Sequence, residues 1–225
     1  MDDSYRNEPV EEVSFERLHA LLNSVAVSTA DGRSLEFEQG AQLMRMMLEG
    51  THAVGHQIIC IGNGGSAAIA AHMAADFSKN GLRAVCFSNL SALTAIANDD
   101  GFEHVFEQQV DLHARAGDVL VAISSSGESR NVLRAVQAAR RKGVRIVAFS
   151  GMFAGNALRC AADLSFYLPS NIYGLLEVGH HCLCHFVLMR SMQSRGMSIG
   201  RATEAGELQA KPRRLSYPFA EDQTS

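Results

Sequence analysis

The sequence predicts an α/β fold, a doubly wound parallel sheet of five strands flanked by helices, with two N-terminal helices before the first strand. Short apolar, β-branched runs alternate with segments whose apolar residues recur at three- and four-residue steps. Two of these runs break into loops rich in glycine and serine, at residues 62–66 and 124–129. Alternation of strand and helix is typical of a parallel sheet covered on both faces.

The expected elements follow from this periodicity and from the turn residues between the segments. Helices at 15–27 and 35–53, joined by a turn at 30–33, precede the sheet. Strands are expected at 57–61, 83–88, 118–123, 144–149 and 163–168. Further helices are expected at 66–79, 91–97, 102–115, 129–142, 155–161 and 172–195. Both glycine- and serine-rich loops then lie at the carboxyl ends of strands, where α/β sheets bind ligands.

Composition indicates a single soluble domain. The chain has 225 residues, of which 47% are hydrophobic, and a net charge of −4, enough to bury one sizeable core. We expect a domain at 13–199 between polar tails at 1–12 and 200–225. The mild acidity makes nucleic acid an unexpected partner.

The sequence also bears on location and redox state. It contains no apolar run long enough to span a bilayer and no signal peptide at its N-terminus. We therefore expect a cytoplasmic protein with no membrane partner. The five cysteines are odd in number and lie in apolar segments, which favours buried, reduced thiols.

The two loops have the composition of an anion site. Glycines in the first loop let the backbone approach a ligand, and Ser66 follows at the start of a helix. In the second loop, four hydroxyls surround Gly127 and suit the oxygens of a phosphate group; they belong to Ser124, Ser125, Ser126 and Ser129. We expect Glu128 to point to solvent. The loops together predict a phosphorylated ligand.

A dinucleotide-binding loop is the alternative for the first of them. Gly62-x-Gly64-x-x-Ala67 fits that pattern. The pattern also needs a carboxylate near the end of the second strand to hold a ribose, and that strand ends Cys86-Phe-Ser-Asn89. The missing carboxylate argues against a nicotinamide or flavin protein.

Histidines and carboxylates recur at helical spacing in two segments. His72 and Asp76 are four residues apart, and Glu177, His181 and His185 repeat at four-residue steps. One histidine and one carboxylate from each helix would suit zinc. An ordinary hydrogen-bonded role is the expectation for His104, His113, His180 and His181. Cys182 and Cys184 lie beside these histidines and could suggest a Cys/His zinc site, but residues two apart on a helix point about 200° apart. We therefore expect both cysteines in the core.

With both loops in place, the chain resembles the SIS (sugar isomerase) domain family, and within it the phosphoheptose isomerases. The resemblance covers about residues 15–195. It is carried by residues 62–66, 95–102 and 117–132, together with Glu177 and His185 on the last helix.

This resemblance implies roles for particular residues. The substrate-binding set comprises Asn63, Gly64, Ser66, Lys79, Asp99, Ser124, Ser125, Ser126, Ser129 and Glu177. The catalytic acid/base pair comprises Asp76 and His185, and a zinc ion is expected on His72, Asp76, Glu177 and His185. The family usually has glutamate at the position of Asp76 and glutamine at that of Glu177. Lys79 is expected to replace an arginine that many relatives carry in an insertion. A homotetramer is implied as well.

The expected function is therefore aldose–ketose isomerisation of a sugar phosphate, from sedoheptulose 7-phosphate to D-glycero-D-manno-heptose 7-phosphate through an enediol. Two alternatives remain. One is a non-catalytic SIS adaptor, similar to the relative that binds the bacterial replication initiator, but here Asp76, Glu177 and His185 are present. The other is a sugar-phosphate-sensing domain, for which no DNA-binding segment is evident in the sequence.

Overall fold

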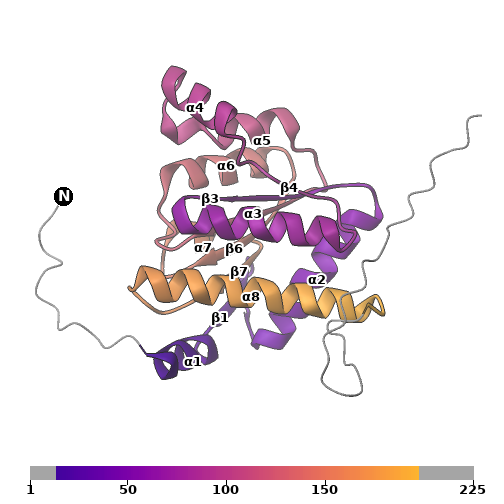
Figure 1. Cartoon of the computed structure of the whole chain (residues 1–225), viewed down its shortest axis with the longest axis vertical. Helices are drawn as coiled ribbons and strands as arrows, with labels where there is room; N and C mark the ends of the chain where they lie inside the picture. The colour runs from indigo at the N-terminus through magenta and orange to yellow at the C-terminus, as the bar shows by residue number, and fades with distance from the viewer. Residues whose placement is uncertain (1–13, 198–225) are drawn as a thin grey trace, which may run out of the picture.

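Seven strands form one sheet in the order β2-β1-β7-β6-β5-β3-β4 in the computed structural model, which describes residues 14–197 (Figure 1). The strands are β1 (Ala26–Thr29), β2 (Ser34–Leu35), β3 (Ile58–Gly62), β4 (Ala84–Cys86), β5 (Val119–Ser124), β6 (Arg145–Ser150) and β7 (Leu164–Tyr167). Strands β3 to β7 are parallel to one another. The predicted sheet of five parallel strands is thus confirmed, and two antiparallel strands extend it.

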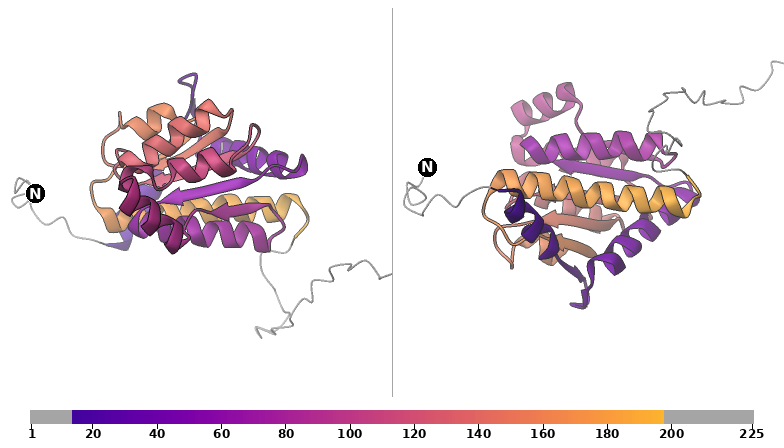
Figure 2. Two further views of the ribbon diagram at one scale, coloured as in Figure 1. Left: turned by 90° about the horizontal axis from the view of Figure 1, so that it is seen from above. Right: turned by 60° about the horizontal axis from the view of Figure 1, so that its bottom comes forward.

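Helices cover both faces of the sheet (Figure 2). They are α1 (Phe15–Asn23), α2 (Phe37–Ala53), α3 (Gly64–Lys79), α4 (Leu90–Asp99), α5 (Glu107–His113), α6 (Arg130–Arg141), α7 (Ala157–Ala161) and α8 (Tyr173–Ser194), with a 3-10 turn at Phe102–His104. Helices α1, α2, α3 and α8 pack on one face, and α4 to α7 pack on the other. The predicted doubly wound arrangement is confirmed.

The N-terminal region differs from the prediction. The turn at 30–33 joins β1 to β2 rather than one helix to another, and the first helix ends at Asn23 instead of 27. Val27 is buried in β1, which pairs antiparallel with β7. Helix α2 packs closely on this strand at Gly40, where an added Cβ would lie only 2.5 Å from the Val27 side chain. The apolar residues of this short segment fit the spacing of a helix and that of a strand equally well.

The central strands are buried on both faces. In β5, Val119, Val121 and Ile123 contact the α3/α8 layer, while Leu120 and Ala122 contact the opposite layer. Burying each of the larger side chains stabilises the fold by about 1.5–3 kcal/mol. The middle of the sheet therefore provides a firm base for the loops that follow its strands.

The order of strands reverses between β3 and β5. Strand β4 pairs with one side of β3, and the chain then crosses to form β5 on the other side. Such a reversal opens a crevice at the carboxyl ends of the two strands, where ligands bind in open α/β sheets. The two glycine- and serine-rich loops follow β3 and β5 and so meet at this crevice.

None of the described helices is long and apolar enough to cross a membrane. All five cysteines are unpaired, as predicted, and burial raises the pKa of the Cys60 and Cys184 thiols. Only Cys60 and Cys184 are buried, however; Cys86 and Cys182 are half-buried and Cys160 is exposed, so the expectation of buried thiols is wrong at those three positions. The predicted tails at 1–12 and 200–225, and the predicted domain boundaries at 13 and 199, lie outside the described residues.

Candidate active site

The first loop makes a sharp turn from β3 into α3. Gly64 has a φ of +53°, and a Cβ on Gly62 would lie 2.6 Å from the carbonyl oxygen of Ser66. The first turn of α3 can therefore pack directly on the end of β3. Ser66 is buried in that turn, beside the free backbone N–H groups of the helix N-terminus.

Asn63 connects the two loops. Its side-chain amide exchanges two hydrogen bonds of 2.8 Å with the amide of Asn131, which is buried in the first turn of α6. The pair ties the N-terminus of α3 to that of α6. Asn131 was not singled out from the sequence, where the resemblance gave Asn63 a contact with sugar instead.

The second loop is held by its own serines. The Ser124 hydroxyl accepts a hydrogen bond from the backbone N–H of Gly127 and lies 3.2 Å from the Ser129 hydroxyl. Ser126 accepts from the N–H of Glu128, and Ser125 is buried. Two helix N-termini and these hydroxyls thus gather around one crevice. This arrangement can hold an anion such as a phosphate group.

Asn156 supports the second loop from below, a role that the sequence did not reveal. It is fully buried, and its amide nitrogen donates to the Ser150 hydroxyl and to the carbonyl of Phe153. Gly127 packs on it with a φ of +68°, and a Cβ there would overlap the Asn156 amide. Glu128 is exposed as expected, but its carboxylate accepts a hydrogen bond from the N–H of Ala157 at the start of α7.

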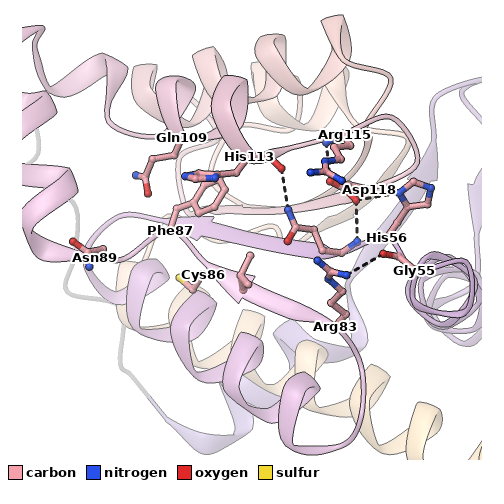
Figure 3. A pocket seen from close by; sticks show the side chains of 12 residues that line it. Gly55, His56, Arg83, Cys86, Phe87, Asn89, Gln109, His113, Arg115 and Asp118 are labelled. Atoms are coloured by element: carbon pink, nitrogen blue, oxygen red, sulfur yellow. Dashed lines mark hydrogen bonds and ion pairs between the residues drawn. The ribbon is translucent and has the colours of Figure 1, made fainter.

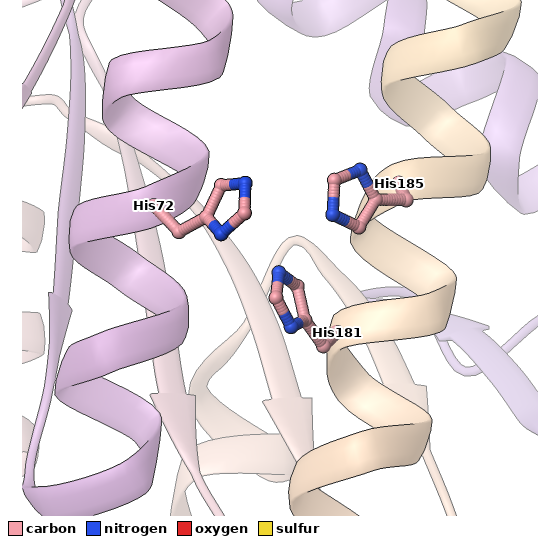
Figure 4. Close-up of side chains that lie close together, drawn as sticks. All are labelled: His72, His181 and His185. Atoms are coloured by element: carbon pink, nitrogen blue, oxygen red, sulfur yellow. The ribbon is translucent and has the colours of Figure 1, made fainter.

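Three histidines lie between α3 and α8, which pack side by side (Figure 4). They are His72, His181 and His185, and one nitrogen from each lies within 4.8 Å of the other two. Ring centroids are 4.7 to 5.2 Å apart. The prediction that His181 has an ordinary hydrogen-bonded role is wrong, because the parallel course of the two helices brings it opposite His72.

Asp76 borders this cluster. Its Oδ2 atom lies 3.2 Å from Nε2 of His72 and 3.9 Å from Nδ1 of His185. Its Oδ1 atom has no hydrogen-bond partner among residues 14–197. The structure thus brings together three of the four predicted metal ligands, His72, Asp76 and His185, and leaves one carboxylate oxygen available.

The cluster suits a divalent metal ion. Nε2 of His181 is buried and has no hydrogen-bond partner within residues 14–197. Burial, followed by the charges of His185 and His72, lowers the pKa of His181 and so favours neutral imidazole, the form that binds metals. Imidazole nitrogens with a neighbouring carboxylate are typical ligands of zinc. The donor atoms present therefore fit the metal that the sequence predicted.

Glu177 lies apart from the histidines. Its carboxylate rests on Gly65, where a Cβ would overlap all three carboxylate atoms. Gly65 precedes His72 by seven residues of α3, which corresponds to about 10 Å along the helix axis. Glu177 therefore occupies the N-terminal end of α3, next to the anion crevice, and the predicted ligand set is not assembled as a whole.

Two predicted substrate-binding residues lie away from the loops of the same chain. Lys79 is at the last turn of α3, about 20 Å from Ser66 along the axis. Asp99 is exposed at the end of α4 and accepts a hydrogen bond from Asn98. Within one chain, Lys79 stands at the opposite end of the helix from the serine loops, so the expectation that it replaces an arginine at the phosphate stays a prediction.

His180 and His104 form hydrogen bonds, as predicted. His180 is fully buried, and its Nε2 atom donates to the carbonyl of Ser150 over 3.1 Å. Burial lowers the pKa of His180 to about 4. His104 pairs with Glu107 over 3.0 Å.

A separate cavity of about 530 Å³ runs along the edge strand β4, and His113 lies in its wall (Figure 3). Many of the residues around it precede the parallel strands; they include His56, Gln57, Arg83 and Asp118. They lie at the amino ends of these strands, opposite the serine loops. This cavity is therefore not part of the candidate active site.

Comparisons with known proteins agree with this geometry. The family model of the SIS domain matches residues 18–151. The phosphoheptose isomerase of Rhodospirillum rubrum is 41% identical over 144 residues, which make up 59% of this chain and 76% of that protein. A probable phosphoheptose isomerase of Thermoplasma acidophilum is 36% identical over 140 residues, or 59% and 76% of the two chains.

Solved structures give the same answer. A phosphoheptose isomerase from Neisseria gonorrhoeae superposes with a TM-score of 0.65 and 36% identity, covering 68% of this chain and 86% of that one. One from Francisella tularensis gives a TM-score of 0.64 at 25% identity, with 69% and 86% covered. The match spans the switch point, the two serine-bearing loops and α3 with His72 and Asp76. On this evidence the chain belongs to the SIS domain family.

Proposed function

We propose that the protein is an aldose–ketose isomerase acting on a sugar phosphate. The observation that carries the proposal is that α3 begins at the anion cradle of the serine loops and bears His72 and Asp76 of the acid/base cluster further along its length. Relatives named phosphoheptose isomerase, at about 40% identity, support the same class of reaction.

The substrate that we propose is sedoheptulose 7-phosphate, with D-glycero-D-manno-heptose 7-phosphate as the product. Ser66 and Asp76 are ten residues apart on α3, about 15 Å along the axis. A substrate that reaches from the serine loops to Asp76 must carry its phosphate far from its carbonyl group. A seven-carbon sugar with a terminal phosphate meets that requirement better than a three-carbon one.

The serine loops orient the substrate in this mechanism. Hydroxyls of Ser66, Ser124, Ser126 and Ser129, with the N–H groups at the starts of α3 and α6, donate to the phosphate oxygens. The distal phosphate then fixes the position of C1 and C2 relative to the cluster. Asn63 holds the two helix starts at a constant separation through Asn131.

The proton transfer belongs to Asp76 and His185. The free Oδ1 atom of Asp76 takes the proton from one carbon and returns it to the neighbouring carbon, while His185 exchanges a proton with the substrate oxygens. His72 orients Asp76 through the contact of 3.2 Å at Oδ2. Asp76 removes and returns the carbon-bound proton on the same face of the enediol.

A zinc ion would be held by His72 and His185 with Asp76 beside them. When bound, it supplies polarisation of the carbonyl and hydroxyl oxygens of the substrate. The deprotonating group remains Asp76.

The test is turnover of sedoheptulose 7-phosphate by the purified protein and by the Asp76→Asn variant. Asparagine is close in size to aspartate but cannot accept the proton, so we expect kcat to fall by about 10²–10⁴-fold with little change in substrate binding. Aldose formation gives the rate, and calorimetry with the substrate gives the affinity. Normal turnover by the variant would refute the assignment of the base. Tight sugar-phosphate binding without turnover by the unaltered protein would favour the sensor or adaptor role.

A further inference from the structure

We propose that His181 is a metal ligand of this protein, completing a three-imidazole site with His72 and His185, and that Glu177 lies outside that site. The proposal rests on the proposed function for the presence of a metal, but the choice of ligands comes from the geometry of this chain. The ion is a divalent transition metal with an affinity for imidazole, such as zinc or cobalt.

The first argument is the convergence of the three rings. His72 on α3 and His181 on α8 face each other with ring centroids 4.8 Å apart, and His185 closes the triangle one helical turn along α8 (Figure 4). One nitrogen of each histidine lies within 4.8 Å of the others. Three nitrogens drawn from two helices can supply three of the four ligands of a tetrahedral site.

The second argument is the orphaned nitrogen. Nε2 of His181 is removed from solvent and has no hydrogen-bond partner among the residues that the structure describes. A buried polar atom without a partner costs about 1–3 kcal/mol, and a coordinate bond to a metal ion would satisfy it. Of the three histidines, His72 already contacts Asp76 at 3.2 Å and His185 does so at 3.9 Å. Among the described residues His181 has no such partner, so a metal ion between the three rings would complete its contacts.

The third argument is the place of Glu177. Its carboxylate packs on Gly65 at the start of α3, about two turns before His72. There it faces the positive end of the helix, which favours a negative charge. Reaching the cluster would require the side chain to leave this position, whereas His181 already lies in the cluster. Glu177 then borders the anion crevice, and Asp76 remains the carboxylate of the metal site.

The experiment measures binding of Co²⁺ alone to the full-length protein after chelator treatment, by calorimetry and by the visible absorption of the bound ion. Loss of a residue that only supports a ligand weakens metal binding by about 10- to 100-fold. We expect His181→Ala to weaken Co²⁺ binding by more than this and to change the absorption spectrum. Glu177→Gln should leave affinity and spectrum within about threefold of the original, which is small against that range. His113→Ala, in the separate cavity, is the control for weak binding to surface histidines.

His181→Gln serves as a second variant if the alanine form does not fold, and thermal unfolding without metal checks both. The proposal is overturned by three results: no Co²⁺ binding by the unaltered protein, unchanged affinity and spectrum after replacement of His181, or a large loss of affinity in Glu177→Gln. These readouts need no substrate. Metal binding without isomerase activity would therefore reject the proposed function and leave the ligand assignment standing.

Discussion

The serine loops and the histidine cluster share α3 but are held by different forces. At the serine end, backbone turns, buried amides and hydroxyls satisfy one another, as in the Asn63–Asn131 pair and the bonds from Asn156. At the histidine end, the packing of α3 on α8 and the contacts of Asp76 bring the rings together, and a buried nitrogen of His181 has no partner in the described part of the chain.

This difference predicts that binding of a phosphate group and binding of a metal ion affect the protein in different ways. The anion crevice is already organised, so a phosphate group meets donors that need little rearrangement, and preorganisation strengthens binding. The histidine cluster contains an unsatisfied polar atom, so a bound metal ion would stabilise the folded protein as well as the site. Substitutions should therefore be able to disrupt the anion crevice and the histidine cluster independently of each other.

The largest effect on the serine end is expected from Gly127→Ala. The left-handed conformation costs a residue with a side chain about 1–2 kcal/mol, and displacing the buried Asn156 amide adds about 1–3 kcal/mol. We expect the free energy of unfolding, measured in urea, to fall by the sum of these costs, and phosphate binding to be lost.

Co²⁺ binding by folded Gly127→Ala should be unchanged, because the histidines lie on other parts of α3 and α8. Gly50→Ala is the matched control: it lies inside α2, and nothing is within 4 Å of the added Cβ. Alanine there should be neutral or stabilising by about 0.5–1 kcal/mol. Loss of metal binding together with phosphate binding would show that the two ends are one unit.

Acid should destabilise the folded protein through His180, which is fully buried. The pKa of His180 is lowered from 6.5 to about 4 because burial disfavours the charged ring. Between these values the unfolded chain binds more protons than the folded one, so stability is complete above pH 6.5 and is lost as the pH falls towards 4. The slope from this residue approaches about 1.4 kcal/mol per pH unit.

His180→Gln keeps a donor for the carbonyl of Ser150 but does not titrate. Urea unfolding between pH 7 and 4.5, within the window that the two pKa values set, should show a flatter pH dependence in this variant. His19→Gln, at an exposed position of α1, should keep the original slope. An unchanged slope in His180→Gln would mean that other groups cause the acid sensitivity.

The serine end could be predicted from the sequence because its information is local. In each loop a β-branched run leads directly into its turn residues, three glycines before Ser66 in the first loop and four serines around Gly127 in the second. Alternation of strands and helices then places both loops at the same edge. The same locality explains the error at the N-terminus. Four residues of β1 and two of β2 are too few to separate a strand period from a helix period.

The histidine end depends on a long-range fact, the register of α8 against α3. Spacing alone marked Glu177, His181 and His185 as one face of a helix, but not which of them lies opposite His72. The packing of Glu177 on Gly65 decides it. Asn131 and Asn156 were missed for a similar reason, because a buried asparagine is recognised by its partners and not by its neighbours in sequence.

The smallest expected effect tests how the two helix starts are joined. Asn63 and Asn131 exchange two hydrogen bonds of 2.8 Å, and Asn131 is 2% exposed. Replacing either residue with alanine leaves the other amide unsatisfied, so each single variant should lose about 1–3 kcal/mol of unfolding free energy. The double variant should lose less than the sum, with a coupling energy of about 1 kcal/mol.

Asn23→Ala, at an exposed position on α1, is the control and should be nearly neutral. If the pair sets the separation of the two helix starts, each single variant also binds phosphate more weakly while its affinity for Co²⁺ stays the same. Additive effects on stability, with unchanged phosphate binding, would contradict this role and leave the serines alone to organise the crevice.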